Sequence, residues 1–129
     1  MLFGNQPFIA DMTERAVREG STVAAGMRSR FAARAKFLHD RLSQDNSLTV
    51  QQPQAGMFAM VNISSTGTDG EKYALDLLEN GGVAVMPGSS FGTTMDSWVR
   101  VALTINDSDF ELAIDRIIKH SRTLRQEFT

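Results

Sequence analysis

Arg100 is the residue of this sequence whose chemistry can be argued most directly from its neighbours. Apolar residues alternate along positions 97–105, which predicts a β-strand with Arg100 near its middle. Because an unpaired buried cation is costly, the guanidinium must either reach water or be held for an anion. Its planar fork of donors fits both oxygens of a carboxylate. Two interpretations stay open at this point: a carboxylate clamp, and an arginine on an edge strand in an ordinary ion pair.

A turn-rich segment leads into this strand. Residues 87–96 read PGSSFGTTMD, in which Pro, Gly, Ser and Asp favour turns, and residues 83–86 before them have strand character. We expect Phe91 and Gly92 at the tight end of this loop. Gly88 or Gly92 should then adopt backbone angles that are unfavourable for other residues.

The pattern V-A-V-x-P-G-x-x-F-G, followed by an arginine in an apolar strand, resembles the C-terminal part of the fold type I pyridoxal-phosphate-dependent aminotransferases of classes I and II. Residues 53–58, PQAGMF, are similar to the P-x-G-G-M-F motif of that family, with Ala55 in place of the first Gly. The matching positions of the loop and strand are Pro87, Gly88, Phe91, Gly92 and Arg100.

This resemblance implies a role for each matching residue. Arg100 would bind the substrate α-carboxylate, with Phe91, Gly92 and Phe58 supporting it. Residues 21–129 would form the C-terminal small domain, and residues 1–20 a lead helix from the end of a missing large domain or from an interdomain segment. The longer parent protein would use pyridoxal 5'-phosphate to transfer an amino group between an amino acid and a 2-oxo acid.

The chemistry of the cofactor itself is not apparent in this chain. Its lysines are Lys36, Lys72 and Lys119, and all three fall in segments with helical patterns rather than in a Ser- or Gly-rich loop. No Gly-rich turn leads into a helix to hold a phosphate. We therefore expect the isolated chain to bind no cofactor and to be inactive. The alternative is a stand-alone, non-catalytic domain that binds carboxylates or other partners.

Composition excludes several other classes. The 129 residues include no cysteine, which excludes disulfides and thiolate metal sites, and His39 has no second ligand at metal-binding spacing. The net charge of -2 gives no electrostatic case for nucleic acid or an anionic membrane. No apolar run is long enough to span a membrane, and no signal sequence is apparent. The expected compartment is the cytoplasm.

The remaining segments predict an α+β fold, with helices packed on one small mixed β-sheet. Helices are expected over residues 7–20, 21–43, 71–79 and 110–125, with caps at Ser21 or Thr22, at Thr68 and at Ser108. Strands are expected over residues 48–50, 56–63, 83–86 and 98–104. An abrupt apolar start suggests a cut end. We expect Phe3, Phe8, Ile9 and the region of Phe58 to be exposed and to drive homo-oligomerisation, in the parent as a dimer.

Overall fold

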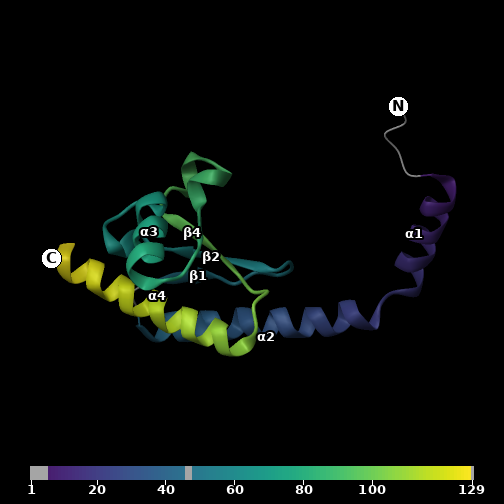
Figure 1. Cartoon of the computed structure of the whole chain (residues 1–129), viewed down its shortest axis with the longest axis horizontal. Coiled ribbons are helices and arrows are strands. Elements are labelled where there is room, and N and C mark those ends of the chain that lie inside the picture. Colours follow the sequence, from purple (N-terminus) through teal and green to yellow (C-terminus); the bar gives the residue numbers. More distant parts are fainter. Residues whose placement is uncertain (1–5, 46–47, 129) are drawn as a thin grey trace. The chain divides into compact units, whose positions relative to one another are not determined.

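The computed structural model describes residues 6–45 and 48–128, and the chain divides into two compact units, residues 1–30 and 31–129 (Figure 1). Phe3, which we expected on an exposed apolar surface, lies outside the described residues. The two units are described separately below.

The first unit contains helix α1 (Pro7–Glu19) and the start of helix α2 (Thr22–Asp45). Pro7 occupies the first turn of α1, where its missing N–H costs nothing, and the helix ends at Gly20 with φ 70°. The Ser21 hydroxyl accepts a hydrogen bond of 3.2 Å from the Ala24 amide, so Ser21 caps α2 as the sequence predicts. None of the α1 side chains is buried.

The second unit contains the rest of α2, a sheet and helices α3 (Gly70–Asp76) and α4 (Asp107–Phe128). Three ion pairs join α2 to α4 in the same order along both helices, which shows that the two run side by side and in parallel (Figure 1). These pairs are Arg34 with Asp107, Arg41 with Asp115, and Asp45 with Arg122.

The sheet has four strands in the order β1-β2-β4-β3. The strands are β1 (Thr49–Gln51), β2 (Phe58–Asn62), β3 (Met86–Pro87) and β4 (Trp98–Ala102). All three neighbouring pairs are antiparallel, so the prediction of a mixed sheet was wrong in this respect. Side-chain alternation shows which residues share a face of a strand, but it carries no information on the direction of the neighbouring strand.

Strand β3 is shorter than the sequence pattern indicates. Residues 83–86 were expected to form a strand, but only Met86 of that run pairs with β4. Val83 and Val85 are instead outside the paired part of β3 and pack on the hydrophobic core. Their apolar character reflects burial, which β-propensity alone cannot distinguish from strand pairing.

The ends of the helices of this unit depend on caps that are shifted from the predicted positions. Asp69, rather than Thr68, caps α3 by accepting a 2.8 Å hydrogen bond from the Lys72 amide. Beyond Asp76 the helix continues as one π-helical turn over Leu77–Gly81 and stops at Gly82, whose φ is 65°. Asn106, rather than Ser108, caps α4 by accepting from the Asp109 amide at 2.9 Å.

One face of the sheet is covered by helices and the other is open. The core combines residues of α2, the sheet, α3 and α4. On β2 and β4 the buried residues are Ala59, Val61, Val99 and Val101, whereas the alternate residues, including Phe58, Met60, Trp98 and Arg100, are half-buried or exposed. The α+β fold class predicted from the sequence is confirmed. Among the described residues, no helix is long and apolar enough to cross a membrane.

Candidate functional site

Arg100 lies in the middle of β4, which is an inner strand of the sheet. In the register of the sheet it is opposite Met60 of β2 on one side and Met86 of β3 on the other. No residue in the described part of the chain forms a hydrogen bond or an ion pair with its guanidinium. The edge-strand ion pair left open by the sequence is therefore not what the structure shows.

Two aromatic rings flank the Arg100 guanidinium. Its Cζ lies 4.7 Å from the centroid of the Phe58 ring and 5.0 Å from that of the Phe91 ring. A guanidinium over a ring face is stabilised by about 0.5–1 kcal/mol at an exposed site and by about 2 kcal/mol when desolvated. Phe58 and Phe91 are 43% and 51% exposed, so the rings orient the cation without enclosing it. Its N–H donors have no acceptor among the described residues.

The loop that carries Phe91 has the glycine geometry expected from the sequence. Short turns over Gly88–Phe91 and Thr93–Met95 meet at Gly92, whose φ is 134°. L side chains rarely adopt this angle, so the prediction for Gly92 is confirmed. The Gly92 amide donates to the Ser89 carbonyl at 3.2 Å, and the Gly92 carbonyl accepts from the Met95 amide at 3.0 Å. Gly92 thus places the Phe91 ring beside Arg100.

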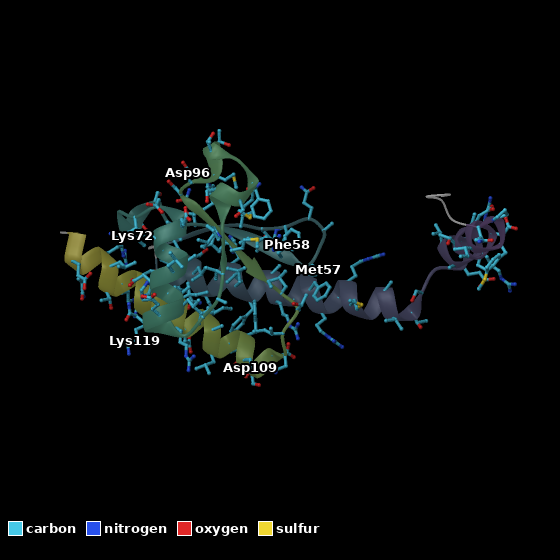
Figure 2. All side chains as sticks on the ribbon, turned by 45° about the horizontal axis from the view of Figure 1, so that its top comes forward. Met57, Phe58, Lys72, Asp96, Asp109 and Lys119 are labelled. Atoms are coloured by element: carbon cyan, nitrogen blue, oxygen red, sulfur yellow. The ribbon has the colours of Figure 1, made fainter. Side chains whose placement is uncertain are left out.

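The segment with the second motif, residues 53–58, leads directly to the Phe58 ring. Gly56 has φ 88°, and the Met57 carbonyl accepts a 2.8 Å hydrogen bond from the Leu103 amide just beyond β4. This bond extends the pairing of β2 with β4 past Phe58, which is opposite Ala102. Figure 2 shows Met57 and Phe58 together at this end of the sheet.

A buried arginine lies close to the same end of β4 and was not singled out by the sequence analysis. Arg34 is only 8% exposed. It donates to the Leu103 carbonyl at 2.6 Å and to an Asp107 carboxylate oxygen at 2.7 Å. Its spacing of three from Phe31 and four from Leu38 puts it on the apolar stripe of α2, which was the available signal.

Comparison with known proteins identifies the family. A family model described as "Aminotransferase class I and II" matches residues 5–117. The chain belongs to this family. The resemblance inferred from the two motifs is therefore confirmed.

Relatives in this aminotransferase family are longer than this chain. It is 30% identical over 117 residues to "Arginine--pyruvate transaminase AruH" of Pseudomonas aeruginosa, an alignment that covers 91% of this chain and 30% of that protein. It is 31% identical over 102 residues to "Probable N-acetyl-LL-diaminopimelate aminotransferase" of Bacillus subtilis, which covers 79% of this chain and 26% of the relative. The chain thus spans about a quarter to a third of the length of these curated relatives.

Solved aminotransferase structures share the fold. The aromatic aminotransferase from Pyrococcus horikoshii OT3 superposes with a TM-score of 0.73 at 27% identity, over 79% of this chain and 28% of that one. A PLP-bound aminotransferase from Clostridium difficile 630 superposes with a TM-score of 0.75 at 24% identity, over 84% of this chain and 28% of that one. The small antiparallel sheet with its helices is the shared part.

The cofactor of this family does not fit the residues described here. Lys36, Lys72 and Lys119 all lie exposed on helices, and Lys36 is paired with Asp40 at 2.5 Å. Lys72 lies on α3 and Lys119 on α4, whereas Phe58, whose ring lies beside Arg100, is on the sheet (Figure 2). None of the three is placed in the desolvated surroundings that would activate an amine. The three lysines are therefore not suited to hold the cofactor.

A polar cluster between α3 and α4 belongs to the helical layer. The Tyr73 and Ser121 hydroxyl oxygens are 2.7 Å apart; Ser121 donates to the Ile117 carbonyl, so Tyr73 donates to Ser121. Burial raises the pKa of Tyr73 to about 12, against the opposing effect of the Ser121 hydrogen bond. The His120 ring lies edge-on to Tyr73, with Nε2 at 3.1 Å from an Asp76 carboxylate oxygen. This cluster joins two helices and lies on the covered side of the sheet.

Proposed function

We propose that this chain is the C-terminal small domain of a pyridoxal-phosphate-dependent aminotransferase and that Arg100 binds the substrate α-carboxylate. The observation that carries the proposal is a guanidinium held between two rings with no acceptor of its own in the described protein. Family membership supplies the reaction class, the transfer of an amino group between an amino acid and a 2-oxo acid.

Arg100 would act by orientation as well as by charge. Two parallel N–H donors that hold both oxygens of a carboxylate fix the direction of the attached Cα and its amino group. Orientation of this kind contributes to the rate of the reaction and not only to binding. Phe58 and Phe91 would keep the guanidinium plane in place while the site is empty, and Gly92 would allow the turn that brings Phe91 there.

The rest of the site would come from the longer protein. We propose that residues 21–129 form the small domain and that residues 1–20 connect it to a large domain that holds the cofactor and its lysine. The parent would be a cytoplasmic homodimer, and this chain alone would be inactive without the cofactor lysine. The named substrates of the relatives, arginine with pyruvate and N-acetyl-LL-diaminopimelate, indicate the amino acids to try first.

The test is the Arg100→Ala variant of the longer protein that contains this chain. Charge-assisted hydrogen bonds are worth about 1.5–3 kcal/mol, so kcat/KM for amino acids should fall by at least about tenfold to a hundredfold. Arg100→Lys keeps the charge without the fork and should lose nearly as much. A matched control is Arg41→Ala, which removes only an exposed ion pair with Asp115. Unchanged kcat/KM for every amino acid in Arg100→Ala would show the assignment to be wrong.

A further inference from the structure

The contacts of Arg34 connect helix α2 to the strand that carries Arg100. Its Nη1 donates to the Leu103 carbonyl at 2.6 Å, and its Nε and Nη2 each lie 2.7 Å from the same Asp107 carboxylate oxygen. Leu103 follows β4 directly, and Asp107 is the first residue of α4. One guanidinium therefore ties together a helix, the end of a strand and the start of the next helix.

The Leu103 peptide passes this constraint on to the Arg100 site. While its carbonyl accepts from Arg34, its amide donates to the Met57 carbonyl at 2.8 Å. Met57 precedes Phe58, whose ring lies 4.7 Å from the Arg100 Cζ. Leu103 is thus held between α2 and the residue that precedes β2. The next residue, Phe58, carries one of the two rings beside Arg100.

The surroundings of Arg34 explain why an arginine is needed there. Its side chain is 9% exposed, and burying a cation without partners is costly. The planar fork lets one group satisfy a carbonyl and a carboxylate in different directions at once, which an ammonium on a flexible stem does less well. Asp107 is 76% exposed, so the carboxylate keeps its hydration while it neutralises the buried charge.

We propose that Arg34 is a positioning residue that sets the place of Arg100 relative to the Phe58 ring. It does not touch the proposed substrate; it acts through the Leu103 peptide. Its relevance to the reaction rests on the proposed function, whereas its effect on the geometry of Arg100 does not.

The first experiment measures that geometry in the 129-residue chain itself. An arginine between two phenyl rings has side-chain proton resonances shifted by the ring currents, so the Arg100 δ and ε protons report the stacking by NMR. Arg34→Lys should move these resonances at least halfway to unstacked values while the amide spectrum stays folded. Arg41→Lys, on the same helix and also paired with α4, should leave them in place. Unmoved Arg100 resonances in a folded Arg34→Lys chain would overturn the proposal.

A second variant covers the case in which Arg34→Lys does not fold. Asp107→Asn keeps Arg34 and its bond to Leu103 but removes the neutralising charge, at an exposed position. It should shift the Arg100 resonances in the same direction by a smaller amount. No shift in a folded Asp107→Asn chain, together with an unfolded Arg34→Lys chain, would show Arg34 to be a folding residue only and would contradict the proposal.

The kinetic experiment separates this inference from the proposed function. In the longer protein, Arg34→Lys should lower kcat/KM by about tenfold, mainly through KM, for an L-amino acid substrate. It should have little effect with the amine that lacks only the carboxylate of that amino acid. If Arg100→Ala shows this carboxylate-specific loss and Arg34→Lys does not, the positioning role fails and the proposed function stands. If Arg100→Ala shows no such loss, the proposed function fails.

Discussion

Gly88 and Gly92 shape the loop before Arg100 for two different physical reasons. Gly92 is required for its backbone angle, because L side chains rarely adopt a φ of 134°; space is not the reason, since an added Cβ would meet no atom within 4 Å. Gly88 is required for space: an added Cβ would lie 2.2 Å from the Met95 carbonyl oxygen and 2.7 Å from that of Trp98. Both contacts are with backbone atoms, which cannot move aside as a flexible side chain can. The loop is therefore fitted to the start of β4.

The Gly88→Ala substitution should consequently destabilise the fold. Overpacking typically costs about 1–3 kcal/mol and sometimes more, and we expect the upper part of this range because backbone atoms are involved. The free energy of unfolding in urea measures it. Gly26→Ala is the matched control, since an added Cβ there meets no atom within 4 Å and alanine is favoured in helices. Equal stability of Gly88→Ala and the original chain would contradict the close approach.

Tyr73 should make the free energy of unfolding of the chain depend on pH in the alkaline range. Its pKa is raised by burial from the ordinary value of 10.0 to about 12. Between these values the unfolded chain has already lost the phenol proton and the folded chain still holds it. The unfolded state therefore binds fewer protons, and the free energy of unfolding should fall as pH rises from 10 to 12, by at most about 1.4 kcal/mol per pH unit.

The chain contains one tyrosine, so ultraviolet absorbance of the phenolate reports this group alone. The folded chain should titrate near pH 12, and the chain in denaturant near pH 10. In Tyr73→Phe this component of the pH dependence should vanish. A folded-state midpoint close to 10 would show that Tyr73 is not protected as the structure indicates.

At the scale of elements, the start of α4 shows how a cap is chosen. Asn106 Oδ1 accepts from the Asp109 amide at 2.9 Å, and Asn106 Nδ2 donates to the Asp109 carboxylate at 2.7 Å. Ser108, expected to be the cap, instead donates to Asn106 Oδ1 at 2.8 Å. Because Asp107 is already helical and is held by Arg34, the helix begins earlier than the apolar stripe indicates.

Substitution of Asn106 and of Ser108 should show which of the two residues caps α4. Asn106→Ala should lower the free energy of unfolding by about 1 kcal/mol, the usual cost of losing an N-cap side chain. Ser108→Ala should cost clearly less, because Asn106 keeps its bond to the Asp109 amide. Urea unfolding of both variants, monitored by circular dichroism, measures these two losses. A larger loss of unfolding free energy for Ser108→Ala than for Asn106→Ala would show that Ser108 is the cap.

At the scale of the whole molecule, the apolar surface of the first unit is the feature that stands out. Helix α1 buries no residue, and Phe8, Met12 and Val17 are 60%, 67% and 77% exposed. Four of its five charged residues are paired along the helix, Glu14 with Arg18 and Arg15 with Glu19. Apolar surface of this kind is usually covered by association. The longer protein that we propose would cover it with its remaining parts, whereas the isolated chain has only another copy of itself.

We therefore expect the isolated chain to self-associate through this segment. Sedimentation velocity at increasing concentration should show dimers or larger species, and the double substitution Phe8→Ser and Met12→Ser should shift the chain towards monomer. Arg15→Gln, which breaks an exposed ion pair on the same helix, serves as the control and should leave association unchanged. A chain that sediments as a clean monomer at high concentration would contradict the expectation.

Local physical chemistry accounts for what the sequence by itself determined. The break between α1 and α2 follows from Gly20 and the Ser21 cap, the strand character of β2 and β4 from alternation, and the unusual angle of Gly92 from turn chemistry. Each of these depends on sterics and hydrogen bonds among residues a few positions apart. In the same way, the motif of residues 53–58 and that of residues 83–92 with Arg100 were sufficient to recognise the family.

Only the tertiary structure decided the features that depend on distant residues. The antiparallel directions and the inner position of β4 follow from which strands pair, and periodicity does not encode pairing. The stacking of Phe58 on Arg100 requires the register that sets Phe58 opposite Ala102. Arg34 is of a residue type that usually lies in solvent, yet its helix face is buried and its charge is matched by a carbonyl and a carboxylate from after β4. A buried charge is stable only when such partners exist, and they are brought together only by the folded chain.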